Sequence, residues 1–119
     1  MTKLSEHFDS KEFACKDGCG ANQVEPKLVE ILEGVRAHFG KPVVIVSGRR
    51  CAKHNSKVGG APKSQHLLGT AADIKVKDVA PKMVADYLES QFPDSYGIGR
   101  YKTFTHIDVR GYKARWGSN

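Results

Sequence analysis

The chain has 119 residues, of which 39% are hydrophobic and 27% are charged, and this is the composition of an ordinary globular protein. Its clearest apolar run, residues 43–46, is far shorter than the roughly 20 residues that a membrane-spanning helix needs. Three cysteines, Cys15, Cys19 and Cys51, are too few for a dense disulfide scaffold.

The formal net charge is +6, which suits an anionic partner such as nucleic acid, a membrane surface or an acidic cell wall. The positive residues are scattered along the chain, however. The densest groups are Arg49–Arg50 and residues 110–115, and neither forms a continuous basic block. We therefore expect a general attraction to polyanions and no specific binding of nucleic acid.

The first predicted element is a helix over residues 26–39. Pro26 suits the first helical turn, and Gly40 followed by Pro42 provides a stop. Apolar residues recur at three- and four-residue spacing, which places them on one face: Leu28, Ile31, Leu32, Val35 and Phe39.

Two short segments predict the next strands. Residues 43–47 are short and β-branched, which predicts a buried strand. An irregular stretch with Gly and Pro turn signals follows over residues 49–64. Residues 71–76 predict a second strand.

The last third of the chain predicts one helix and two strands. The helix opens near Asp78 and Pro81, and strands follow at residues 97–101 and 105–109. Helices and strands without a repeating βαβ rhythm predict an α+β fold with a largely antiparallel sheet, in one domain over residues 1–119. The helix is expected to bury Met83, Val84, Tyr87 and Leu88.

The first chemically informative segment covers residues 64–73. His66 precedes a run of small residues that leads into the strand carrying Asp73. Small residues let two backbone segments approach closely, so a loop histidine and a strand aspartate can converge on one ion. Taken singly, Asp73 could instead be a carboxylate at a strand edge, and His66 a solvated loop residue.

The second informative segment covers residues 104–109. Strand periodicity places His106 and Asp108 on one face, with Thr105 and Ile107 on the other. Two histidines and one carboxylate, with a fourth position open to water, form the ligand set of hydrolytic zinc. A buried hydrogen-bonded pair of His106 and Asp108 is the alternative.

Several short motifs occur together in the order typical of one family. The chain resembles the D-alanyl-D-alanine carboxypeptidase family of zinc peptidases, which shares its fold with the hedgehog signalling domain. The resemblance covers roughly residues 8–116, and the branch that it most resembles includes small phage-encoded lysis enzymes and bacterial cell-wall proteins. The motifs are Ser47-Gly48-Arg49-Arg50, His54-Asn55, Val58-Gly59-Gly60-Ala61, Ser64-x-His66-x-x-Gly69-x-Ala71-x-Asp73 and Phe104-Thr105-His106-Ile107-Asp108.

The resemblance implies a fold and a metal. The fold is a central, mainly antiparallel sheet flanked by helices, of the hedgehog/DD-peptidase type. The metal is Zn²⁺, held by His66, Asp73 and His106. The implied function is hydrolysis of peptide bonds in bacterial peptidoglycan stem peptides, as a carboxypeptidase or an endopeptidase in cell-wall lysis or remodelling.

The resemblance also assigns residues to the substrate. Arg50 takes the place of the family's substrate-binding arginine, where it can anchor a carboxylate or stabilise the oxyanion. Arg49 occupies the position that is aromatic in the family motif, and it is assigned to substrate binding together with Ser64.

The general base departs from the family pattern. Many relatives place Glu, Asp or His two or three residues before the last metal ligand, and here those positions hold Thr103 and Phe104. Asp108 is the nearby carboxylate and the expected base. The departure also supports an alternative function, a catalytically inactive zinc-containing module of the same fold with a wall-binding or phage structural role.

The remaining expectations concern location and the cysteines. No apolar segment follows Met1, so no secretory signal is expected. We expect a monomer that is made in the cytoplasm and acts at the cell wall after release. Cys15, Cys19 and Cys51 could hold a second zinc together with His54, form one disulfide, or be buried apolar residues.

Overall fold

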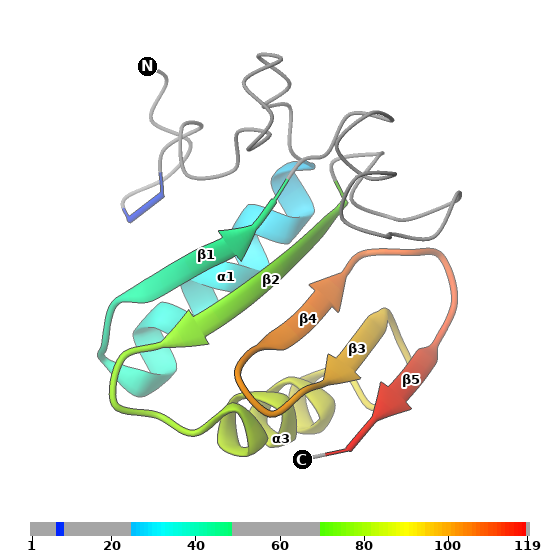
Figure 1. Ribbon diagram of the computed structural model, residues 1–119. Coiled ribbons are helices and arrows are strands. Elements are labelled where there is room, and N and C mark those ends of the chain that lie inside the picture. The colour runs from blue at the N-terminus through cyan, green and yellow to red at the C-terminus, as the bar shows by residue number, and fades with distance from the viewer. Residues whose placement is uncertain (1–6, 9–24, 49–69, 119) are drawn as a thin grey trace.

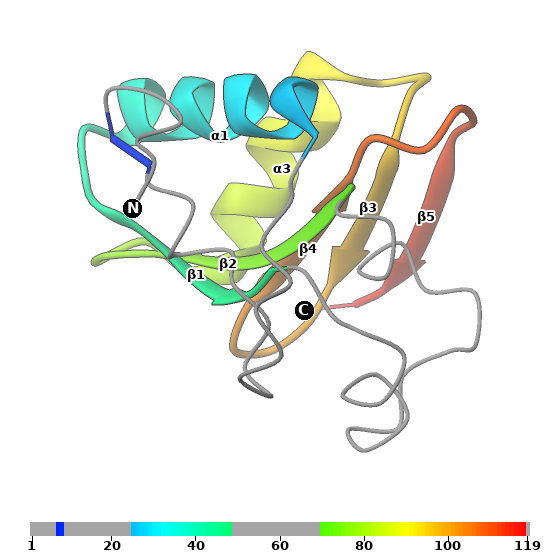
Figure 2. The ribbon, with the colours of Figure 1, turned by 90° about the horizontal axis from the view of Figure 1, so that it is seen from above.

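A computed structural model describes residues 7–8, 25–48 and 70–118. These residues form two layers, a five-stranded sheet and two helices that cover one of its faces (Figures 1 and 2). The α+β class expected from the sequence is therefore confirmed.

Helix α1 (Pro26–Phe39) has the predicted bounds. Pro26 occupies the first turn, and the chain leaves the helix at Gly40, whose φ is 64°. The predicted apolar face is the buried one, although Phe39 at its end is only partly covered. The buried residues are Leu28, Val29, Ile31, Leu32 and Val35.

Helix α3 (Pro81–Gln91) buries a narrower stripe than the sequence suggested. Val84 and Leu88 lie one turn apart and are fully covered. Met83, expected in the core, is 57% exposed, because it lies at the border of this stripe together with Tyr87. No helix in the part of the chain that the structure describes is long and apolar enough to cross a membrane.

The strand order is β1-β2-β4-β3-β5, and neighbouring strands are antiparallel except for the parallel pair β3 and β5. The largely antiparallel sheet is thus confirmed, but strand β5 was not predicted. It is half-exposed and carries the charged Arg115, so it lacks a strong alternating pattern. The strands are β1 (Val43–Ser47), β2 (Ala71–Val76), β3 (Gly97–Arg100), β4 (Thr105–Asp108) and β5 (Ala114–Gly117).

Strand β1 is less buried than expected. Val43 and Ile45 belong to the core, but Val44 between them is 54% exposed. The strand lies at the edge of the sheet and buries one face, so its side chains alternate between core and surface.

The core lies between the sheet and the helices. Ile74, Ile98 and Ile107 come from the three central strands, are fully buried, and belong to one cluster with apolar residues of both helices. Figure 2 shows α1 and α3 on the same side of the sheet. The apolar residues of these strands are therefore used on the helix side, and the other face is left for different chemistry.

This packing predicts that Leu32→Ala and Met83→Ala will differ strongly. Leu32 is fully buried, so its truncation should lower the free energy of unfolding by about 2–5 kcal/mol. The exposed Met83 should change the free energy of unfolding by less than about 0.5 kcal/mol. Urea unfolding followed by circular dichroism measures both. Equal losses of unfolding free energy in the two variants would contradict the placement of Leu32 in the core and of Met83 on the surface.

Candidate metal centre

Strand β4 separates two kinds of side chain by simple alternation. Thr105 and Ile107 point to the helices, where the Thr105 hydroxyl donates to the Pro81 carbonyl at 3.1 Å. His106 and Asp108 occupy the other face, as the period of two predicted. Both are buried, with 7% and 0% of their surface exposed. The polar pair is therefore held by a strand whose other face is anchored in the core.

Asp73 reaches the same place from the neighbouring strand. In the antiparallel pairing of β2 with β4, Asp73 lies directly opposite His106. Side chains in such opposed positions share one face and lie close together. The Asp73 Oδ1 and His106 Nδ1 atoms are 2.9 Å apart. The convergence of Asp73 and His106 on one point thus follows from strand register.

The second nitrogen of the His106 ring faces another carboxylate. His106 Nε2 lies 2.7 Å from Asp108 Oδ2, so the imidazole bridges two aspartates. Burial alone would lower the pKa of His106, but the hydrogen bonds to Asp108 and Asp73 outweigh it, and the pKa is raised. The hydrogen-bonded pair of His106 and Asp108, weighed as an alternative, is present, and it coexists with the approach of Asp73.

Arg110 completes the set. Its Nε donates to Asp108 Oδ1 and its Nη2 to Oδ2, each at 2.7 Å, which is a bidentate pair. Burial alone would raise the pKa of Asp108, but the hydrogen bonds from Arg110 and His106 hold it well below its usual range. The Asp108 carboxylate is therefore a stable anion with both oxygens occupied.

Two glycines of β3 make room for this arrangement. A Cβ built at Gly97 would collide with the Asp108 carboxylate and with Arg110, and one built at Gly99 would collide with the Trp116 ring. Gly97 and Gly99 lie opposite Asp108 and His106 in the register, on the same face of the sheet. The side chains of the neighbouring strands therefore lie over the bare backbone of β3.

Aromatic rings close the site on the side of β5. The Arg110 guanidinium carbon lies 5.1 Å from the centre of the Trp116 ring and 5.4 Å from that of Tyr112. The Trp116 ring centre is 5.0 Å from that of His106, and its Nε1 donates to the Tyr101 hydroxyl at 2.8 Å. Trp116 thus touches both His106 and the cation that binds Asp108.

Arg110 and Trp116 were missed in the sequence. Arg110 could have been found, because it follows Asp108 by two residues and so falls on the same strand face. Trp116 could not, because its place depends on the unpredicted pairing of β5 with β3.

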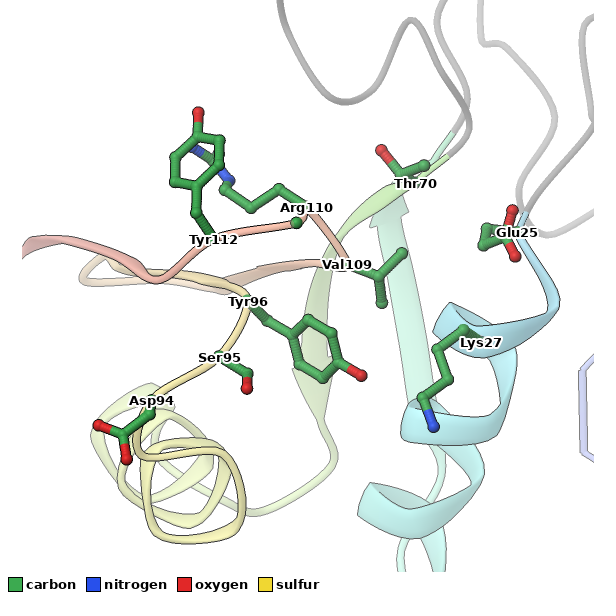
Figure 3. Close-up of a pocket in the computed structure, with 10 residues that line it drawn as sticks. Glu25, Lys27, Thr70, Asp94, Ser95, Tyr96, Val109, Arg110 and Tyr112 are labelled. Atoms are coloured by element: carbon green, nitrogen blue, oxygen red, sulfur yellow. The ribbon is translucent and has the colours of Figure 1, made fainter.

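A cavity of about 430 Å³ lies beside these residues, between the first turn of α1 and the connections that flank β3 and β4. Figure 3 shows Tyr96 and Lys27 directed toward the space between them, while Arg110 extends toward Tyr112. The lining includes Arg110 but not Asp73, His106 or Asp108. The cavity therefore lies next to Asp73, His106 and Asp108 but is not lined by them.

The comparison with known families decides the classification. A family model described as Peptidase M15 matches residues 5–108. The chain belongs to the peptidase M15 family. This is a family of zinc peptidases of the D-Ala-D-Ala carboxypeptidase type, as the sequence motifs indicated. A search of curated proteins found no match.

Four residues expected at an M15 site lie outside the described part of the chain: Arg49, Arg50, Ser64 and His66. The three cysteines and His54, for which a second zinc site or a disulfide was considered, also lie outside it. Within residues 7–8, 25–48 and 70–118, no three His, Cys, Asp or Glu side chains gather as a metal site requires. Asp73 and Asp108 face opposite nitrogens of His106, so they do not converge on one point with it.

Asp73 and His106 nevertheless have the right chemistry to bind a zinc ion. A carboxylate oxygen and an imidazole nitrogen meet in a largely buried place, and both are ordinary donors to Zn²⁺. The other imidazole nitrogen is held by a carboxylate, the arrangement that metal-binding histidines usually show. A third donor is needed, and His66 of the family motif is the residue that the sequence offers.

The close approach at β3 predicts different effects for two glycine substitutions. Gly97→Ala should lower the free energy of unfolding by about 1–3 kcal/mol, because the new methyl group displaces Asp108 and Arg110. Gly111→Ala is the matched control, because a Cβ there meets nothing within 4 Å. Chemical denaturation measures the loss, and the imidazole NMR signals of His106 should move in Gly97→Ala alone. An unchanged free energy of unfolding in Gly97→Ala would show that Asp108 and Arg110 do not lie over β3.

Proposed function

We propose that this M15 peptidase is a zinc enzyme that hydrolyses peptide bonds in bacterial peptidoglycan stem peptides. The observation that carries the proposal is the convergence of Asp73 and His106, at 2.9 Å, on the face of the sheet that points away from the helices. The family match supports peptidase chemistry, and the conversion of peptide to acid and amine needs water as the only co-reactant.

His66, Asp73 and His106 would hold the metal. The chemistry that zinc supplies when bound is polarisation of the scissile carbonyl and activation of water near neutral pH. The protein's own contribution is orientation. Asp73 is fixed by strand pairing, and the His106 ring is fixed by Asp108 on its far nitrogen.

The surroundings of Asp108 favour a role other than that of general base. A base must accept a proton from water, which requires access and a pKa near the working pH. Asp108 has no exposed surface, its oxygens bind Arg110 and His106, and its pKa is lowered. We assign Asp108 to orienting His106, and we leave the base to a group outside this cluster.

We assign substrate recognition to residues of the earlier motifs. Arg50 would bind a carboxylate of the peptide, and Arg49 and Ser64 are assigned to substrate binding with it. Stem peptides are rich in carboxylates, so a chain of net charge +6 is compatible with them. The two arginines of the C-terminal segment are already engaged, because Arg110 binds Asp108 and Arg115 donates to the Phe92 and Tyr96 carbonyls.

The deciding experiment is digestion of purified peptidoglycan, followed by mass spectrometry of the products. New amine and carboxylate ends within the stem peptides support the proposal, and their position shows whether the enzyme trims ends or cuts cross-links. A chain that binds zinc and the wall, yet releases no product from any peptidoglycan type, would establish the alternative of an inactive module of the same fold.

The metal assignment predicts about one zinc per purified chain. His66→Ala and Asp73→Ala should each lower this content sharply, because each removes one of three protein ligands. Asp94→Ala provides a control, since Asp94 lies in the cavity lining and not beside His106. Elemental analysis by mass spectrometry gives the stoichiometry. Full zinc retention in both ligand variants would refute the ligand set.

The orienting role predicts that Asp108→Asn weakens zinc binding about 10–100-fold and that saturating zinc restores most of the turnover. A general base would behave differently, because its loss leaves zinc affinity unchanged and lowers turnover alone. Competition with a chromophoric chelator measures the affinity, and the peptidoglycan assay at saturating zinc measures the turnover. Unchanged affinity with lost turnover would restore Asp108 as the base.

A further inference from the structure

We propose that Arg110 is a positioning residue of the metal site: with Trp116 and Tyr112 it holds Asp108 against Nε2 of His106, which leaves Nδ1 as the nitrogen that a metal beside Asp73 can bind. The inference rests on the proposed zinc site and names a group that the ligand motif does not contain. Arg110 touches neither Asp73 nor the ring nitrogens of His106 in any contact described above. Its effect is transmitted through Asp108.

The first step concerns the geometry of Asp108. A carboxylate can rotate about its Cβ–Cγ bond, but a guanidinium fork binds both oxygens in one plane. The side chain of Arg110 makes this bidentate contact and its backbone N–H adds a hydrogen bond to Oδ1 at 3.2 Å. Rotation of Asp108 would break all these bonds together, so its Oδ2 is held at Nε2 of His106.

The second step concerns the histidine tautomer. Carboxylates lie beside both ring nitrogens, Asp108 at Nε2 and Asp73 at Nδ1. A metal that binds beside Asp73 would take the lone pair of Nδ1, and the proton would then be on Nε2, where the fixed Asp108 carboxylate accepts its hydrogen bond. The fork of Arg110 thus leads to a lone pair directed at the place where the metal is expected.

The third step concerns Arg110 itself. The guanidinium lies against the rings of Trp116 and Tyr112. Tyr112 is itself 64% exposed, so it covers Arg110 from the solvent side. Contacts of this kind restrain a long side chain that would otherwise move freely. Gly97 and Gly99 leave room for Arg110 and Trp116 above β3. The aromatic rings therefore hold the fork against Asp108.

The experiment compares Arg110→Gln and Arg110→Lys with Arg100→Gln. Arg100 is a matched control, because it is another arginine of the same sheet that binds carboxylates, those of Asp86 and Glu89 on the helix side. Arg110→Lys keeps the charge beside Asp108 but loses the fork. Circular dichroism confirms the fold of each variant, Zn²⁺ affinity is measured by chelator competition, and ¹⁵N NMR with and without zinc follows the His106 ring.

The expected result is a loss of Zn²⁺ affinity of about tenfold in Arg110→Lys and up to about 100-fold in Arg110→Gln. In the zinc-loaded protein, His106 should carry its proton on Nε2 in the wild type and in Arg100→Gln, and in the metal-free protein the His106 imidazole signals should move only in the Arg110 variants. A purely structural Arg110 would lower thermal stability as Arg100→Gln does, without moving the imidazole signals.

Two outcomes separate this inference from the proposed function. If the wild type binds zinc and folded Arg110→Lys and Arg110→Gln keep its affinity and imidazole signals, the role of Arg110 is refuted and the zinc site stands. If the wild type binds no zinc, the proposed function fails, while the His106 imidazole signals of the metal-free variants still show whether Arg110 holds Asp108 against the ring. An unfolded Arg110→Gln leaves Arg110→Lys to give the same decision.

Discussion

The buried carboxylate of Asp108 is the constraint on which the site depends. An anion with no exposed surface is costly unless every oxygen is hydrogen-bonded and its charge is compensated. Here the imidazole of His106 and the fork of Arg110 meet both needs. Removing Arg110 would leave the buried carboxylate with the imidazole as its remaining side-chain partner, and removing His106 would leave one carboxylate hydrogen bond unmade. These three side chains are therefore expected to behave as one unit.

The rest of the sheet is arranged around this unit. The helix-facing residues of β2, β3 and β4 form the core, which anchors each strand without occupying the other face. On that face, β2 brings Asp73 opposite His106, and β3 contributes two glycines where bulkier residues would collide. The Arg100 ion pairs with Asp86 and Glu89 then tie β3 to α3 from behind. The positions of Asp73 and His106 therefore depend on the packing and register of the whole sheet.

This arrangement also explains how two side chains that are ordinary zinc donors come together in the sheet. Asp73 and His106 come from adjacent strands, where register alone sets their separation. The His106 ring is oriented by Asp108 and, through it, by Arg110, which lie two and four positions further along the chain. The aromatic residues near β5 shield the unit and leave Tyr112 and Tyr101 partly exposed beside it.

The sequence by itself determined the elements with strong periodicity. Helix α1, the opening of α3, strands β1 to β4 and the two faces of β4 all follow from local patterns of apolar residues, because burial imposes periods of 3.6 and 2. The family motifs likewise indicated the M15 assignment and named Asp73 and His106. Tertiary structure alone decided which nitrogen of His106 faces Asp73, and that Asp108 is enclosed by Arg110. It also decided that β5 joins the sheet, and that Met83 and Val44 remain exposed. These features depend on contacts between strands that are distant in the chain, and local periodicity carries no information about such partners.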